Sequence, residues 1–492
     1  MKRSLCILLA VLLLAGCQPN TPSDVIEETK NVLSLCSAGG TTPLNPAAKS
    51  DKALFDLLYD PLFVTDATFA PQGALAESHT VDGTTVTVRL YPDLLFSDGT
   101  AVDARDVVDT VMTVKYHPEY VYYPSVKNIY DLHIVDSQTV EFTLLSPDPF
   151  FLEKLNFPIL PSEAKTGLYP AGTGRYRLTD ALQNEHTFEV NEYYRGTPPL
   201  IGTLRVHLLP DGETVRYAYR AGTVDALYTQ ARRISDYSGV GSTATPFESM
   251  KFTFIGYRTD HPLLQHQNVR QAISQAVDRQ KLAETILMGY GTVTDLPFHP
   301  VHYQFADLLE MPTPADLETV TDLLLKTPSD EEGNGIPLTF TLLVNGDDVA
   351  AINMAASLSV MLAPAGLTVT VEEQPFETYT QRIAEGSFDA YLGQVDFSTP
   401  DMAAELLVTD GALNFGGFTN EKVDQAFADL RTAASDAAFH TAATDLTVLL
   451  KREQPLLSLF FEQDLLMTKN VLTGDLTPTP DRPFNGAEFW ER

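Results

Sequence analysis

Short segments that alternate apolar and polar residues recur along this 492-residue chain, and helical patterns lie between them. Strict alternation is typical of strands that bury one face. The clearest examples cover residues 86–90, 140–144, 204–208, 338–342 and 367–371. Because strands that alternate with helices favour α/β domains, the pattern predicts a mixed α/β fold.

Two of the intervening helices have readable starts. Asp103 is predicted to cap a helix with apolar residues over 107–112, and Asp106 would favour the helix dipole from the first turn. Asn268 and Gln271 resemble a capping box at the start of a second helix. At about 150 residues per domain, a chain of this length predicts about three domains.

The N-terminus has the features of an export signal. Lys2 and Arg3 precede an apolar run over residues 5–14, which is too short to span a membrane. The run ends in the sequence LAGC, which resembles the lipobox of bacterial lipoproteins and implies cleavage before Cys17 and lipid attachment to its thiol. An ordinary secretory signal cut nearby is the alternative. We therefore expect an extracytoplasmic protein that a lipidated Cys17 anchors to the bacterial membrane.

Cysteine count and charge exclude several classes of protein. With Cys6 removed and Cys17 lipidated, only Cys36 remains, so neither an intramolecular disulfide nor a cysteine zinc site is expected. A formal net charge of −32 leaves no basic face for nucleic acid. Residues 18–29 have no apolar periodicity and are expected to form a flexible tether.

Enzyme signatures are missing from the sequence. It contains no Gly-x-Ser-x-Gly elbow, no His-Glu-x-x-His and no phosphate-binding Gly-x-x-x-x-Gly-Lys motif. His299 and His302 lie in a proline-flanked loop without a carboxylate at ligand spacing, so we expect solvated loop histidines and not metal ligands. We predict no catalytic residue, no metal and no cofactor, and hence a binding protein.

Several segments, in order along the chain, resemble solute-binding proteins of family 5, the extracytoplasmic receptors of ABC importers for peptides and nickel. The FSDGT sequence and the helix after it resemble a segment of that family, and NVRQAISQAVDR resembles another. The segments that carry the resemblance are residues 73–78, 96–100, 171–178, 220–227 and 268–279. The resemblance covers nearly the whole chain after the signal segment.

The resemblance implies a periplasmic-binding-protein-like α/β fold of class II. Two hinged lobes would close on a ligand, and a further domain would be inserted in the first lobe. The division implied is a signal peptide over 1–16, a lipidated tether over 17–29, lobe I over 30–58, 172–257 and 463–492, an inserted domain over 59–171, and lobe II over 258–462.

The resemblance also implies candidate ligand-binding residues. Residues 393–400 occupy the stretch in which peptide-binding relatives place an aspartate against the ligand's α-ammonium, and Asp396 takes that place. A capping or interlobe salt-bridge role for Asp396 is the alternative. Gln394 stands where tryptophan is common, Phe397 is a candidate cleft aromatic, and Arg258 would bind a ligand carboxylate or brace the hinge.

The expected function is therefore capture of oligopeptides between two lobes and their delivery to an ABC permease. The same fold binding a nickel chelate or another small solute is one alternative, and a surface sensor or interaction protein without transport is another. We expect a monomer, because the family works one receptor at a time.

Overall fold

The computed structural model describes residues 31–38, 46, 51–162, 169–239, 241–312, 314, 316–328 and 335–492. The expected signal peptide, Cys17 and the tether lie outside the described residues. The described chain is a mixed α/β protein, as the alternating segments predicted, and its strands form four sheets. Among the described residues, no helix has the length and apolarity of a membrane span.

The first sheet has four strands in the order β1-β10-β9-β8. Its strands are β1 (Val32–Ala38), β8 (Tyr176–Ala181), β9 (Glu185–Val190) and β10 (Thr203–Leu209). β1 runs parallel to β10, and the other pairs are antiparallel. The helix α2 (Lys52–Leu58) buries Leu54 and Leu58 in the same core as Trp490, the only tryptophan of the chain.

A second four-stranded sheet is antiparallel throughout, in the order β4-β5-β7-β6. Its strands are β4 (Ala76–Asp82), β5 (Thr85–Leu90), β6 (Ile129–Asp136) and β7 (Thr139–Leu144). The helix α3 (Ala104–Lys115) packs on it, and the predicted cap is confirmed: Asp103 and Asp106 form a capping box. A hairpin of β2 (Phe63–Thr65) and β3 (Pro71–Gly73), the short helix α4 (Tyr123–Val126) and the 3₁₀ turn η1 (Glu153–Leu155) complete this region.

The largest sheet has seven strands, with β11-β17-β12-β16-β14-β15 in order and β13 paired to β17. Two long antiparallel strands form its centre, β12 (Ser242–Tyr257) and β17 (Leu456–Lys469). The others are β11 (Ala226–Gln230), β13 (Gly291–Val293), β14 (Thr339–Asn345), β15 (Thr368–Gln374) and β16 (Ala390–Asp396). The pairing of β12 with β17 is interrupted by a bulge between Phe247 and Lys251.

Both faces of this sheet are covered by helices. Ile255 on β12 faces a core with α7 (Gln267–Ala276), α8 (Arg279–Leu287), α9 (Leu317–Leu324) and α10 (Val349–Leu362). Phe254 faces the other core, which contains α11 (Phe376–Ala384), α12 (Ala404–Leu407), α13 (Glu421–Arg431) and α14 (Asp436–Glu453). The predicted capping box of α7 is wrong, because Asn268 instead donates hydrogen bonds to Leu323 and Thr327.

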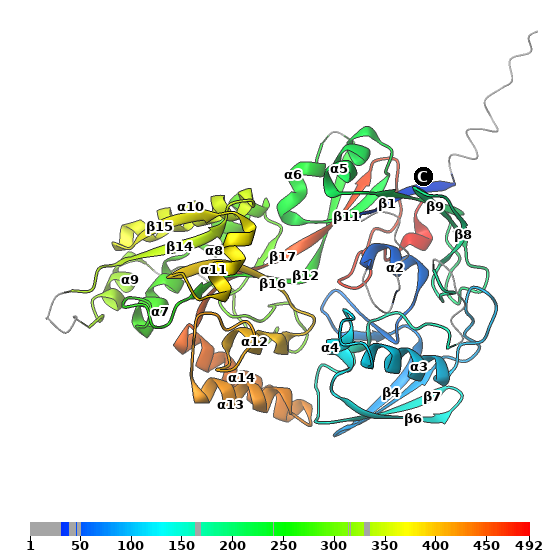
Figure 1. Ribbon diagram of the computed structural model, residues 1–492, viewed down its shortest axis with the longest axis horizontal. Coiled ribbons are helices and arrows are strands. Elements are labelled where there is room, and N and C mark those ends of the chain that lie inside the picture. The colour runs from blue at the N-terminus through cyan, green and yellow to red at the C-terminus, as the bar shows by residue number, and fades with distance from the viewer. Residues whose placement is uncertain are drawn as a thin grey trace, which may run out of the picture.

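Figure 1 shows how these parts are arranged. The helices α7 to α11 and the strands β14 and β15 form one end of the molecule, and β1, β8, β9 and α2 lie toward the other. β12 and β17 run from the first end toward β11, α5 (Gly212–Ala221) and α6 (Ile234–Tyr237). The sheet that contains β4, β6 and β7 lies below α2. Residues of β12 and β17 therefore pack both in the cores that contain α7 to α14 and in the cores near α2, α5 and α6.

Candidate functional site

A cavity of about 430 Å³ lies where segments far apart in the sequence meet. Its volume falls within the range of small-molecule sites, roughly 300–1,000 Å³. Its walls come from the end of α2 and the residues after it, the region of α4, the residues after η1, the end of β16 and the C-terminal segment. Among the lining residues are Tyr59, Tyr122, Asn156, Asp396, Phe397, Met402, Asp481 and Arg482.

A second cavity, of about 130 Å³, shares much of this wall. Asp396, Phe397 and Asp481 border both spaces, so the two are neighbours on either side of the same side chains. Glu153 and His302 line the smaller one. The wall of the two cavities thus contains several carboxylates supplied by different parts of the chain.

Asp396 is the last residue of β16, and its side chain is exposed. It lies directly opposite Lys251 of β12, so both side chains project from the same face of the sheet. The Lys251 ammonium is bound by Asp464, at 2.6 and 2.8 Å, and the Tyr228 hydroxyl donates to the same carboxylate at 2.6 Å. The strand ladder therefore fixes Asp396 at the cavity wall, directly across from Lys251.

Phe397 and Gln394 differ sharply in their surroundings. Phe397 is buried, with its ring centroid 5.6 Å from that of Phe252, and it borders both cavities from the apolar core. Gln394 is exposed on β16, two residues before Asp396 and on the same face of the strand, but it borders neither cavity. The structure thus brings Asp396 and Phe397 together at the cavity and leaves Gln394 beside it.

Arg258 lies at the opposite end of the strand pair. Tyr257 faces Ala390, six residues from Asp396 along β16, which corresponds to about 20 Å in an extended strand. The Arg258 guanidinium bonds to Asp260 at 2.7 and 3.0 Å and donates to the carbonyl of Gly386. These contacts favour the bracing role over the binding of a ligand.

The C-terminal segment contributes two wall residues that the sequence did not suggest. Asp481 accepts hydrogen bonds from the backbone and hydroxyl of Thr65, both at 2.8 Å, and from the Asn156 amide at 3.1 Å. Arg482 bonds to Asp60 at 2.6 Å. In the sequence, the two residues stand between prolines and resemble an ordinary turn, so no local pattern could have identified them.

The prediction of solvated histidines in the loop at 299–302 is wrong. His299 and His302 are both fully buried. His302 lies 3.3 Å from Glu153, which also accepts a hydrogen bond from Tyr303, and His299 lies 3.2 Å from Glu248. The carboxylates come from segments far away in the sequence, which is why spacing could not show them. Burial raises the pKa of Glu153.

In the part of the chain that the structure describes, no three His, Cys, Asp or Glu side chains gather as a metal site. Cys36 is the one cysteine there; burial, with Asp51 nearby, raises the pKa of its thiol to about 12. A thiol with so high a pKa stays protonated near neutral pH, so it is a poor metal ligand and nucleophile.

Comparison with known proteins places this arrangement in a family. The model of the bacterial extracellular solute-binding proteins, family 5, matches residues 70–415. The chain belongs to this family. Its members are solute-binding proteins that work with ABC transporters, and they are not known as enzymes. The predicted family is thereby confirmed.

Individual relatives differ in the ligand that their names give. The chain is 26% identical to the nickel-binding periplasmic protein of Escherichia coli over 379 residues, which cover 70% of this chain and 72% of that protein. It is 22% identical to the oligopeptide-binding protein AppA of Bacillus subtilis, over 92% and 90% of the two chains. The family therefore includes binders of quite different solutes.

The fold is shared with solved structures. The ABC transporter substrate-binding protein CtaP of Listeria monocytogenes superposes with a TM-score of 0.79 at 19% identity, over 94% of this chain and 99% of that one. This similarity confirms the expected periplasmic-binding-protein-like α/β fold. At this identity it indicates nothing about the ligand.

Proposed function

We propose that this protein is the oligopeptide receptor of an ABC importer, with Asp396 as the partner of the ligand's α-ammonium. The observation that carries the proposal is the position of Asp396, on a rigid strand at the wall of a cavity large enough for a ligand. A carboxylate in the wall of such a cavity can bind the ammonium at the N-terminus of a peptide through charge-assisted hydrogen bonds.

The charge of the surrounding wall supports an ammonium ligand. Asp481 faces the same two cavities as Asp396 from a different part of the chain, and its hydrogen bonds come from the neutral donors of Thr65 and Asn156. Two carboxylates on one cavity repel each other and favour a positive group between them. Phe397 would add an apolar contact for the first side chain of the peptide.

Ligand capture would work by closure of two lobes. We propose the division given above, with lobe I over 30–58, 172–257 and 463–492, lobe II over 258–462, and the inserted domain over 59–171. The hinge would lie where the chain passes between the lobes in this division, at the end of β12 near residues 257–258 and within β17 near residues 462–463. Ligand contacts from both sides would favour the closed form, which would then dock on the permease.

The cellular setting follows from the N-terminal sequence. We propose that residues 1–16 are a signal peptide and that Cys17 is lipidated, which would anchor the receptor to the bacterial membrane outside the cytoplasm. A binding protein with no catalytic role and a monomeric state fits this setting.

The test is calorimetric titration of tri-alanine into the full chain, freed of co-purified solute. We expect Asp396→Asn to weaken binding about 30-fold or more, because one charge-assisted contact is lost. N-acetylated tri-alanine should bind the wild-type protein no better than tri-alanine binds the variant. Equal affinity of wild type and Asp396→Asn for tri-alanine would contradict the proposal. Asp429→Asn, at an exposed carboxylate on α13 that borders neither cavity, is the matched control and should leave binding unchanged.

A nickel chelate is a second candidate, favoured by the nickel-binding relative and by His302 in the wall of the smaller cavity. The imidazole Nε2 of His302 lies beside Glu153, so a chelate that brings its own ligands suits this wall better than a bare ion. Titration with nickel and L-histidine separates the two candidates. Binding of the chelate without binding of any peptide would favour this second candidate.

A further inference from the structure

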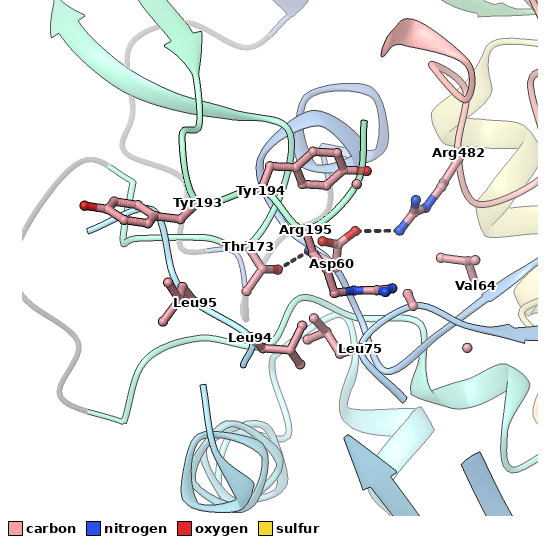
Figure 2. Close-up of a pocket in the computed structure, with 13 residues that line it drawn as sticks. Asp60, Val64, Leu75, Leu94, Leu95, Thr173, Tyr193, Tyr194, Arg195 and Arg482 are labelled. Carbon is pink, nitrogen blue, oxygen red and sulfur yellow. Dashed lines mark hydrogen bonds and ion pairs between the residues drawn. The ribbon is translucent and has the colours of Figure 1, made fainter. Parts of the chain in front are cut away.

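A third cavity, of about 140 Å³, adjoins the proposed peptide site. Val64 and Arg482 line both this space and the 430 Å³ cavity, so the two share a wall. Its other lining residues come from the segment after α2, the β3–β4 connection, the loop after β5 and two loops of the first sheet. They include Asp60, Leu75, Leu94, Thr173, Tyr193, Tyr194 and Arg195 (Figure 2). None of these residues belongs to the wall around Asp396.

Arg195 is the notable side chain of this cavity. Its guanidinium carbon lies 3.8 Å from the centroid of the Tyr91 ring, so a cation–π contact holds it in place. Among the described residues, no carboxylate forms an ion pair with it within 4 Å, whereas most arginines of the fold have one. Figure 2 shows the guanidinium pointing across the cavity toward the side where Arg482 lies.

Arg482 is held differently. It bonds to Asp60 at 2.6 Å, and the backbone N–H of Asp60 donates to the Thr173 hydroxyl at 3.0 Å. The Tyr194 hydroxyl points toward the same side in Figure 2. Burial raises the pKa of Tyr194, so this hydroxyl remains a hydrogen-bond donor at neutral pH.

The cavity therefore has a positive balance within a strongly acidic protein. Two guanidinium groups face it and one carboxylate, that of Asp60, offsets one of them. The remaining positive charge belongs to Arg195, which is fixed by an aromatic ring and keeps its N–H donors for another partner. A guanidinium with fixed orientation is the preferred partner of a carboxylate, which it binds through two parallel hydrogen bonds.

We propose that Arg195, assisted by Arg482 and Tyr194, forms a subsite for a carboxylate of the captured solute. The inference rests on the proposed function, because it assigns the carboxylate to the ligand whose ammonium lies at Asp396. A solute that engages both sites carries an ammonium and a carboxylate, as a peptide with free termini does. A free anion such as acetate has the same chemistry and is the other possible source.

Calorimetry with paired peptides tests this subsite in the full chain. Alanine peptides of two to five residues are titrated as free acids and as C-terminal amides. At the length that fits, we expect the acid to bind wild type roughly 10- to 100-fold more tightly than the amide. Arg195→Gln should reduce the affinity for the acid to that for the amide and leave the affinity for the amide unchanged. Arg105→Gln, an exposed arginine on α3, should keep the full preference.

The other outcomes either overturn the inference or show whether the inference or the proposed function has failed. An equal loss for acid and amide in Arg195→Gln, or no preference in wild type, overturns it while Asp396-dependent peptide binding still stands. Acetate that raises the melting temperature only when Arg195 is present, without a preference for the acid peptide, shows a free-anion site and also overturns it. If no peptide binds, the proposed function fails. Binding of nickel with L-histidine is then compared with binding of nickel with histidinamide to test the same subsite. A preference for the L-histidine complex that depends on Arg195 supports the subsite, and equal binding of the two complexes overturns it.

Discussion

Four charged side chains on and beside β12 and β17 differ from Arg195 in one respect, the completeness of their pairing. Lys251 of β12 is paired with Asp464 of β17, and Arg232, in the turn after β11, is paired with Glu462 of β17. At the cavity that adjoins the peptide site, Arg195 has a tyrosine ring as its neighbour and no ion pair with a described carboxylate. We call the first group, Arg232, Lys251, Glu462 and Asp464, the strand cluster.

The comparison shows how one chain uses the same residue types for two purposes. The carboxylates of the strand cluster are almost fully buried, and a buried charge persists only when a partner offsets its desolvation. Arg195 is exposed, so its guanidinium stays in contact with water until a ligand replaces it. Full pairing therefore marks charges that hold the two long strands together, and incomplete pairing marks charges that can recognise a solute.

The strongest way to break this comparison is to remove one partner from the strand cluster. Arg232→Ala leaves Glu462, which is completely buried, without its guanidinium. We expect the free energy of unfolding to fall by about 3–5 kcal/mol, as for other buried pairs that lose one member. Urea denaturation measured by circular dichroism gives this value, with the fluorescence of Trp490 as a second probe.

Arg233→Ala is the matched control for this variant. Arg233 is the next residue, its side chain is 42% exposed, and it pairs with Asp236 at 3.1 Å. Because exposed pairs contribute little, the loss should be about 0.5 kcal/mol or less. Similar losses for the two arginines would mean that burial does not separate the two groups of charges.

Much of the fold followed from local sequence patterns. The alternating segments became β5, β7, β10, β14 and β15, and Asp103 with Asp106 formed the predicted capping box. These features depend on neighbours within a few residues, which the sequence shows directly. The second capping box failed because Asn268 found tertiary partners in Leu323 and Thr327, and tertiary contacts override a local motif.

The site was less predictable, because its walls join distant segments. The resemblance pointed to Asp396 and Phe397, which both border the large cavity. It did not point to Asp481, Arg482 or Arg195, which lie more than 80 residues from them and look like turn residues. Only the packing of the C-terminal segment and the first sheet against the region of β2 to β5 brings these side chains to the cavities.

The buried pair of His299 and Glu248 adds a case in which the charge of one partner depends on pH. Burial lowers the pKa of His299 below its ordinary value of 6.5, although Glu248 lies 3.2 Å away. Below pH 6.5 the unfolded chain therefore binds a proton that the folded protein does not, and folding stability falls as the pH falls toward the folded pKa. The melting temperature should decrease between pH 7 and pH 5.5.

His299→Gln should make this part of the pH profile flatter, whatever the variant does to stability at pH 7. Thermal unfolding in buffers of matched ionic strength measures both profiles. A slope that is the same in wild type and His299→Gln would show that His299 carries no such proton linkage. Val301→Ala, a change in the same loop that adds no imidazole and removes none, should keep the slope of the wild type.

We expect the smallest loss of stability and of peptide affinity at Arg258. This arginine tests whether an ion pair distinguishes structural arginines from those that bind ligand. Its guanidinium contacts Asp260 and the carbonyl of Gly386, and it lies on the order of 20 Å along the strand from Asp396. Arg258→Gln should cost about 1 kcal/mol of stability, because the ion pair is partly exposed, and should change peptide affinity less than twofold. Calorimetry of the acid and amide peptides beside Arg195→Gln measures the contrast. A selective loss of affinity for the acid peptide in Arg258→Gln would instead place the ligand's carboxylate at the far end of the strand pair. The absence of an ion pair at Arg195 would then not indicate which arginine binds the solute.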